Sequence, residues 1–165
     1  MLRQWLLVHK GGMDPFFDAH RLCHIGYAVP RMDRALKTWM SLGAKLVIPP
    51  TLDPIQNVEC CLLVYEGAVP VELVSPLPDG PNPLESRLAK GGGLDHVCIF
   101  ADDVETEVER IRALGGFVVV KPCYGVVWDR TLAFVQTTAG LLVEVMSTSP
   151  VGRLANDPLA AVSQA

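Results

Sequence analysis

Apolar and polar positions recur with regular spacing in two stretches of the chain, and both stretches predict the same order of elements. The first stretch predicts one strand, one helix and three further strands, at residues 24–29, 32–42, 45–48, 58–65 and 69–74. The second predicts the same elements at residues 96–101, 104–114, 117–120, 131–136 and 141–146. The expected order is therefore β-α-β-β-β, twice, with fold class α+β.

Local signals mark where several of these elements begin and end. Asp102, with Glu105 three residues later, predicts a capping box at the start of the second helix. Gly43 and Gly115 follow the two helices, where a left-handed C-cap favours glycine. A proline follows each of the strands at 45–48 and 117–120 within two residues, and we expect it to end the strand.

The two stretches align without a gap at an offset of 72 residues. His24 falls on His96, and Val71-Glu72 falls on Val143-Glu144. Leu42-Gly43 falls on Leu114-Gly115 in the same alignment. Because polar and apolar positions both agree over the whole length of a module, we interpret the chain as a duplicated module.

The repeat sets the expected organisation of the chain. We expect an N-terminal arm at 1–23, a first module at 24–78, a linker at 79–94, a second module at 95–148 and a C-terminal tail at 149–165. The linker is rich in proline and glycine and contains a short helical run at 84–89. A module of this size buries too little surface to be stable alone, so the two sheets are expected to pack together or to curl around a shared cleft.

Composition narrows the class of protein. Half of the 165 residues are hydrophobic and 19% are charged, which is typical of one folded domain. The net charge of −4 excludes nucleic acid as an expected partner, and no apolar run reaches the roughly 20 residues that span a bilayer. The odd count of five cysteines does not suggest a disulfide framework. We expect reduced thiols and a cytoplasmic location.

The repeat places a histidine at the start of each first strand and a glutamate inside each last strand, namely His24, Glu72, His96 and Glu144. A single histidine there is usually a hydrogen-bonded structural residue, and a single glutamate usually lies on an exposed face. Both glutamates, however, stand in apolar runs, where a buried carboxylate needs a partner. Two carboxylates and two imidazoles together indicate a divalent cation, Co, Mn, Ni, Zn or Fe. Gly26 and Ala28 are small and leave room beside His24.

Four segments carry a more specific pattern. They are His24-Ile25-Gly26-Tyr27-Ala28-Val29, Val71-Glu72-Leu73-Val74-Ser75-Pro76-Leu77, the stretch from Asn82-Pro83-Leu84 to Asp95-His96-Val97-Cys98, and the stretch from Ala133-Phe134-Val135 to Gly140-Leu141-Leu142-Val143-Glu144. Residues 22–148 resemble, on these segments, the vicinal oxygen chelate superfamily, which includes glyoxalase I, extradiol dioxygenases and the fosfomycin and bleomycin resistance proteins. Within the superfamily they are similar to the methylmalonyl-CoA epimerase branch.

The resemblance implies two tandem βαβββ modules that form a U-shaped, partly closed mixed sheet around a metal-binding cleft. It implies that His24, Glu72, His96 and Glu144 are the ligands of one metal, and that Glu144 is also the catalytic base. Two positions depart from the branch. Cys60 falls where the branch has a second catalytic glutamate, with Glu59 one residue away, and Asp95 replaces the first of two adjacent histidines.

The expected function is that of a metal-dependent isomerase or lyase that transfers a proton next to a carbonyl group, most like an acyl-CoA epimerase or a glyoxalase-like enzyme. Its expected partners are a small-molecule substrate, such as an acyl thioester, and a second copy of the chain in a homodimer. One alternative is an extradiol-type dioxygenase, in which Glu72 would have no role as a ligand. The other is a non-catalytic binding or resistance protein of the same fold, in which the four ligands would not be needed.

Overall fold

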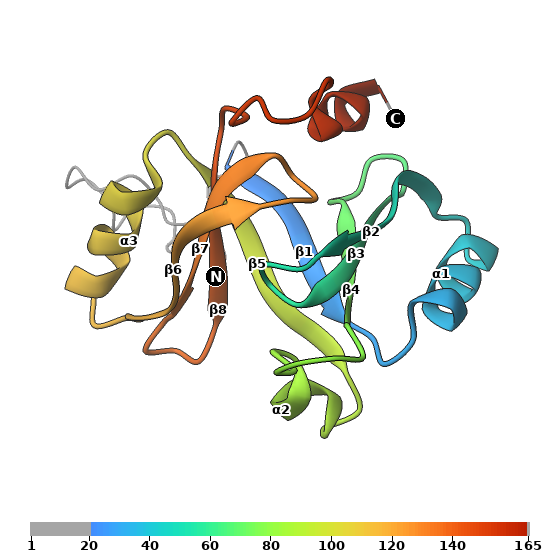
Figure 1. The fold of residues 1–165 in the computed structure, drawn as a ribbon, viewed down its shortest axis with the longest axis horizontal. Helices are drawn as coiled ribbons and strands as arrows, with labels where there is room; N and C mark the ends of the chain where they lie inside the picture. The colour runs from blue at the N-terminus through green and yellow to red at the C-terminus, as the bar shows by residue number, and fades with distance from the viewer. Residues whose placement is uncertain (1–20, 165) are drawn as a thin grey trace, which may run out of the picture.

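One curled sheet of eight strands runs through residues 21–164, the part of the chain that the computed structural model describes (Figure 1). The first half contains β1 (Leu22–Ala28), α1 (Met32–Ser41), β2 (Lys45–Asp53), β3 (Val58–Val64) and β4 (Val71–Pro76). The short helix α2 (Glu85–Leu88) follows. The second half contains β5 (Gly93–Ala101), α3 (Val104–Ala113), β6 (Phe117–Gly125), β7 (Arg130–Gln136) and β8 (Leu142–Ser147), followed by the 3-10 helix η2 (Pro158–Gln164).

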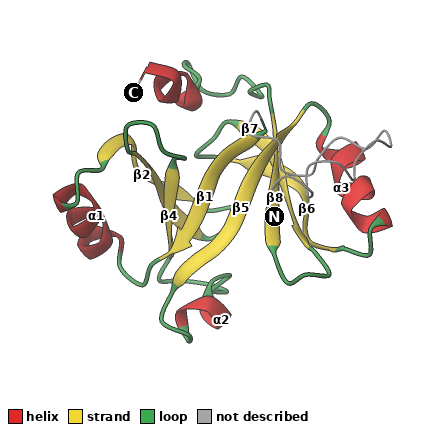
Figure 2. Cartoon of the chain, turned by 180° about the vertical axis from the view of Figure 1, so that it is seen from behind, coloured by secondary structure: helices red, strands yellow, loops and turns green. Residues whose placement is uncertain are grey.

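The strand order, β2-β3-β4-β1-β5-β8-β7-β6, is symmetric about its centre. In each half the first strand pairs in parallel with the last, as β1 with β4 and β5 with β8. The halves join through the antiparallel pair of β1 and β5, which lie side by side in the view from behind (Figure 2). The expected α+β fold of a curled, mixed sheet with two βαβββ halves is confirmed.

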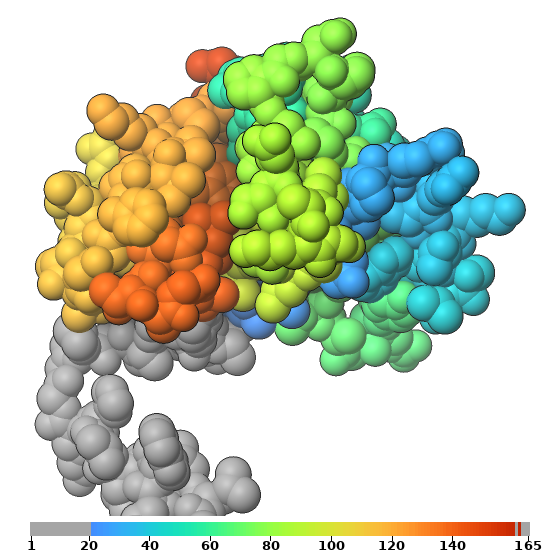
Figure 3. Space-filling view, turned by 90° about the horizontal axis from the view of Figure 1, so that it is seen from below, coloured from blue at the N-terminus to red at the C-terminus, as the bar shows by residue number. Residues whose placement is uncertain are grey.

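Each long helix covers the outer face of its own half. Under α1 lie buried side chains such as Leu63 and Leu73, and under α3 lie Ile99, Val143 and Val145. A third cluster, which includes Trp128 and Met146, fills the inner, concave side of the sheet. From below, the residues between β4 and β5 lie between the two halves (Figure 3). The inner side of the sheet is therefore the place where a site can be shared by both halves.

The predicted elements are present in the predicted order, with two corrections. The prolines do not end the second strand of each half, because β2 and β6 are the edges of the sheet, where the missing N–H of proline removes no ladder bond. The pairing shifts register at these sites, between Ile48 and Thr51 and between Val120 and Cys123. The cap of α3 is Asp103 and not Asp102: its carboxylate accepts from the Thr106 N–H at 2.6 Å.

Other local predictions hold. Gly43 and Gly115 have φ angles of 96° and 92°, as the predicted left-handed C-caps require. The predicted arm comprises residues 1–23, of which 1–20 lie outside the described part of the chain. Within residues 21–164, no helix combines the length and the apolar character needed to cross a bilayer.

The cap gives a test with a matched control. Asp103→Ala removes the acceptor of the Thr106 N–H and leaves the first turn of α3 unsatisfied, so we expect a lower urea midpoint of unfolding. Asp102→Ala, one residue earlier, removes a hydrogen bond with Thr148 on the surface and is expected to leave the midpoint nearly unchanged. Equal midpoints for the two variants would contradict the assignment of the cap.

Candidate metal centre

The four predicted ligands come from the four central strands of the sheet. His24 lies on β1, Glu72 on β4, His96 on β5 and Glu144 on β8. In the first half Gly26, two residues after His24, pairs with Glu72; in the second half Cys98, two residues after His96, pairs with Glu144. A histidine and a glutamate therefore stand diagonally on one face of each parallel pair. The antiparallel pairing of β1 with β5 then brings the two halves' pairs together.

The donor atoms of the four side chains face one another inside the protein. All four can offer a ligand atom within 4.8 Å of the other three, and all four residues are buried. His24 Nε2 lies 3.0 Å from Glu144 Oε2 and 3.4 Å from Glu72 Oε2. His96 Nε2 lies 3.1 Å from Glu72 Oε2 and 3.4 Å from Glu144 Oε2. The predicted convergence of these residues is thus present in the structure.

Burial and mutual attraction act in opposite directions on these groups. Burial by itself lowers the pKa of His24, but Cys23 and the two glutamates raise it well above the ordinary value. Burial likewise opposes the positive charge of His96, whose pKa is raised by Asp95, Glu144 and Glu72. Burial favours the neutral form of Glu72 and Glu144, yet the two imidazoles hold the pKa of both carboxyls below the ordinary range. The two buried carboxylates therefore need positive charge between them to stay ionised.

The two imidazole rings are supported differently. His96 Nδ1 lies 3.1 Å from Asp95 Oδ2, and the edge of its ring meets Phe134 at a centroid distance of 5.2 Å. The ring of His24 stacks on Trp128, with centroids 4.9 Å apart and an interplanar angle of 20°. His24 Nδ1 is buried and has no hydrogen-bond partner among residues 21–164. Carboxylate–histidine pairs of the first kind are common at metal sites.

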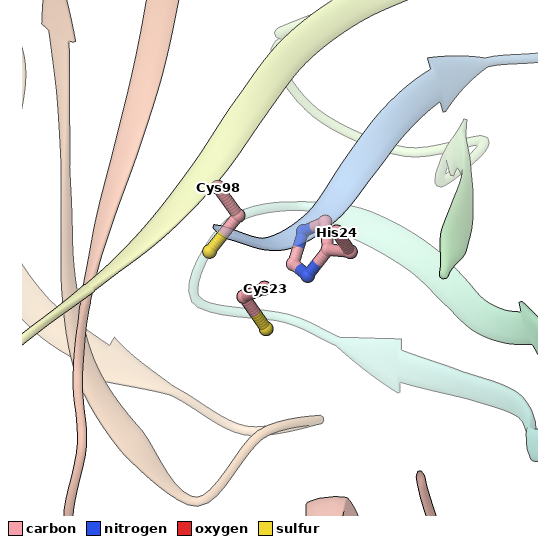
Figure 4. Close-up of side chains that lie close together, drawn as sticks. All are labelled: Cys23, His24 and Cys98. Atoms are coloured by element: carbon pink, nitrogen blue, oxygen red, sulfur yellow. The ribbon is translucent and has the colours of Figure 1, made fainter. Parts of the chain in front are cut away.

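Side chains whose positions could not be predicted from the sequence limit the space beside the four ligands. A Cβ atom on Gly26 would overlap the His96 ring, so the room expected beside His24 is taken by the second histidine. Ala28 lies in the inner cluster. The thiols of Cys23 and Cys98 lie close to His24 (Figure 4). These three residues form a second group whose potential ligand atoms lie within 4.8 Å of one another.

A cavity of about 250 Å³ opens onto Glu72, His96 and Glu144. Most of its wall is apolar, with contributions from both halves: Ile55, Val58, Val74, Leu84, Val119, Val120, Trp128, Phe134 and Leu142. Cys60 lines this cavity, whereas Glu59 does not and accepts a hydrogen bond from Ser75 at 3.5 Å. Burial, followed by the charge of Glu72, raises the pKa of the Cys60 thiol well above its ordinary value.

The residues present fit a divalent cation. Two imidazole nitrogens and two carboxylate oxygens are a donor set typical of Zn, Fe, Co, Ni and Mn. Glu144 Oε2 is buried and faces the Nε2 atoms of His24 and His96 at 3.0 and 3.4 Å, so that these three potential ligand atoms point toward one another. Because buried carboxylates need a compensating charge, a cation between the four groups would satisfy all of them at once.

Trp128 is a part of the site that no pattern in the sequence indicated. Trp128 lies in the turn between β6 and β7, where neither the strand period nor the repeat gives a sign of its direction. Phe134 belongs to one of the segments that carry the resemblance, but its contact with His96 depends on how β7 packs beside β8 and could not be predicted. The contact of Asp95 with His96 Nδ1 could have been suspected, since a carboxylate beside a ligand histidine commonly orients it.

Comparison with known proteins gives consistent relatives. Residues 23–134 match a family model described as the glyoxalase/bleomycin resistance protein/dioxygenase superfamily. The mitochondrial methylmalonyl-CoA epimerase of Bos taurus is 33% identical over 103 residues, which cover 61% of this chain and 58% of the bovine protein. The matched stretch thus spans less than two thirds of that relative.

Two solved structures share the fold. Methylmalonyl-CoA epimerase from Mycobacterium tuberculosis superimposes with a TM-score of 0.68 at 24% identity, covering 79% of this chain and 89% of that one. A methylmalonyl-CoA epimerase from Streptomyces coelicolor, solved in complex with 2-nitronate-propionyl-CoA, gives a TM-score of 0.65 at 23% identity and covers 78% and 97%. At this identity the likeness establishes the arrangement of the chain.

The close approach of Gly26 to His96 can be tested by adding one methyl group. Gly26→Ala should displace the His96 ring and lower the affinity for Zn²⁺ at least about tenfold, as measured by isothermal titration calorimetry. The control is Gly116→Ala, whose added methyl group would crowd Ile111 and the Gln136 carbonyl and none of the four ligands. The control should lose stability and keep its Zn²⁺ affinity. Unchanged affinity in folded Gly26→Ala would contradict this geometry.

Proposed function

Because the chain belongs to the glyoxalase/bleomycin resistance protein/dioxygenase superfamily, we propose that it is a metal-dependent enzyme that transfers a proton next to a carbonyl group, most like an acyl-CoA epimerase. The observation that carries this proposal is the meeting of two imidazoles and two carboxylates beside a mostly apolar cavity, which Glu72, His96 and Glu144 line. The similarity to epimerases of acyl thioesters favours an acyl thioester as the substrate. A homodimer in the cytoplasm is part of the same proposal.

In this proposal His24, Glu72, His96 and Glu144 hold one divalent cation. When bound, the cation acts as a Lewis acid that stabilises negative charge on the carbonyl oxygen as the proton leaves the neighbouring carbon. The apolar walls contributed by Trp128 and Phe134 exclude water from the reacting carbon, which strengthens electrostatic interactions inside the cavity.

Glu144 is proposed as the base that takes the proton. Its carboxylate lines the cavity, where a substrate carbon next to a carbonyl group would lie. Glu72 lies on the other side of the pair of histidines, on β4, and is proposed to serve only as a ligand. Proton transfer by a positioned carboxylate contributes about 10²–10⁴-fold to the rate in other enzymes.

Inversion at carbon needs a second proton-transferring group on the opposite face of the substrate. Cys60 is proposed for this role, since it lines the cavity while Glu59 lies outside its wall. A thiol that burial keeps protonated can return a proton to the carbon that Glu144 has deprotonated.

The proposal is tested by metal analysis of the purified protein, together with solvent-deuterium exchange on a panel of 2-methyl acyl thioesters and hemithioacetals. We expect about one divalent cation per chain and metal-dependent exchange on at least one thioester. Exchange on no substrate, with the metal present, would overturn the proposed reaction. Oxygen uptake with a catechol would instead support the dioxygenase, and tight binding without turnover would support the binding protein.

The role of Glu144 gives a sharper test. Glu144→Gln should lower the rate of deuterium exchange by at least about 10²-fold and weaken metal retention, because both the base and a charged ligand are lost. Glu59→Gln is the control, since this glutamate also lies in a strand but does not line the cavity. Normal turnover by Glu144→Gln would show that the assigned role is wrong.

The role of Cys60 separates exchange from inversion. Cys60→Ala should keep deuterium exchange, which needs only Glu144, and lose most of the inversion of configuration. Chiral chromatography of the substrate measures inversion, while mass spectrometry measures exchange in the same samples. A variant that inverts at the wild-type rate would exclude the thiol as the second group.

A further inference from the structure

The turn between β6 and β7, residues 126–129, carries Trp128 to the ring of His24. Trp128 is buried, stacks on His24 at 4.9 Å and forms part of the cavity wall. Asp129 adopts a left-handed conformation with φ of 52°, which for a residue other than glycine needs support from its surroundings. Two other segments of the chain supply this support.

One support comes from the other half of the molecule. Asp53, at the end of β2, is fully buried, and its Oδ2 atom accepts a hydrogen bond from the Val126 N–H at 2.8 Å. Its Oδ1 atom accepts from the N–H groups of Ile55 and Gln56, both at 3.0 Å. Asp53 therefore ties the end of the β2–β3 hairpin to the start of the turn that carries Trp128.

The other support comes from the segment after β8. The Asp129 carboxylate accepts hydrogen bonds from three successive backbone N–H groups, those of Gly152, Arg153 and Leu154, at 3.0–3.3 Å. The Val151 N–H donates to the Asp129 carbonyl at 2.6 Å, and the Tyr124 hydroxyl donates to its carboxylate at 2.9 Å. The C-terminal segment thus wraps around Asp129.

Arg130, which is buried, continues this attachment through an ion pair with the partly exposed Asp157. Its guanidinium donates to both carboxylate oxygens of Asp157, at 2.7 and 2.9 Å, and also to the Trp128 carbonyl at 2.8 Å. Arg130 is 3% exposed, so its charge depends on Asp157 for compensation. The same guanidinium therefore connects the C-terminal segment directly to the backbone of Trp128.

The linker after the first half makes local contacts similar to those of the segment after β8. Asn57, which precedes β3 as Asp129 precedes β7, also has a positive φ, 58°, and its side chain donates to the Pro81 carbonyl. The linker motif Asn82-Pro83-Leu84 recurs in the C-terminal segment as Asp157-Pro158-Leu159. In both motifs the first side chain accepts from the N–H of the leucine, at 2.8 and 3.0 Å. The segment after β8 is thus a second copy of the linker in its local contacts, not a free tail.

We propose that residues 151–157 are a positioning element of the metal centre, which fix Trp128 against His24 through Asp129, Arg130 and Asp157. The inference rests on the proposed function in taking His24 as a ligand. A ligand histidine needs its ring oriented, and His96 is oriented by Asp95 through its second nitrogen. The Nδ1 atom of His24 has no hydrogen bond among the described residues. The stacked indole of Trp128 orients the His24 ring instead.

Asp157→Asn tests this by weakening the anchor of Arg130. The ring current of Trp128 shifts the His24 ring protons, so NMR of the metal-free protein with labelled histidine should show at least half of this shift lost. The signals of His96 should not shift, because Asp95 holds its ring. Affinity for Co²⁺ should fall about tenfold, the lower end of the range for lost supporting contacts of metal ligands. Asp33→Asn, which removes an exposed pair with Arg31, is the control and should change nothing.

A second pair of variants covers the case in which Asp157→Asn fails to fold. Trp128→Phe should keep the stacked ring and most of the Co²⁺ affinity, whereas Trp128→Leu should lower the affinity about tenfold in a folded protein. Wild-type Co²⁺ affinity in Trp128→Leu, or equal shifts of the His24 and His96 signals in Asp157→Asn, would overturn the proposal. A wild-type protein that binds Co²⁺ but exchanges no proton would overturn the proposed reaction and leave this positioning intact.

Discussion

The antiparallel pairing of β1 with β5 is the contact on which the site depends. It places Gly26 opposite His96 and His24 opposite Cys98, so that the two histidines approach across the seam between the halves. The parallel neighbours β4 and β8 then add one glutamate on each side. The close approach is possible because residue 26 has no side chain. Four ionisable groups are thereby removed from water together, and their charges must be balanced by one another or by a cation.

Much of the fold could be predicted because the same pattern of residues occurs twice in the chain. The period of apolar residues gave the elements, and the offset of 72 residues placed His24, Glu72, His96 and Glu144 in equivalent positions, where the structure brings them together. Edge strands could not be foreseen from the local sequence, since a proline ends a central strand and is tolerated at an edge. The strands β2 and β6 therefore continue past their prolines.

The contacts that turns make could not be predicted from the sequence either. Strand and helix periods report which face of an element is buried, but they say nothing about a side chain in a loop. Trp128 and the carboxylates of Asp53 and Asp129 meet their partners through segments distant in sequence. The C-terminal segment lacks a strong period, because hydrogen bonds to Asp129 and an ion pair to Arg130 hold much of it, and of its described residues only Leu159 and Val162 pack against the inner cluster.

The two halves have diverged where they support their histidines. Asp95 precedes His96 and contacts its second nitrogen, whereas Cys23 stands at the equivalent place before His24, and Trp128 stacks on the ring instead. Cys23 and Cys98 also offer sulfur atoms near His24, so a cation has two conceivable donor sets. X-ray absorption at the zinc edge of the Zn²⁺-loaded protein distinguishes them directly. Two imidazoles and two carboxylates predict one Zn²⁺ per chain with nitrogen and oxygen neighbours only, at about 2.0–2.2 Å. A sulfur neighbour at about 2.3 Å, or fewer than two imidazoles, would contradict the four-residue metal centre.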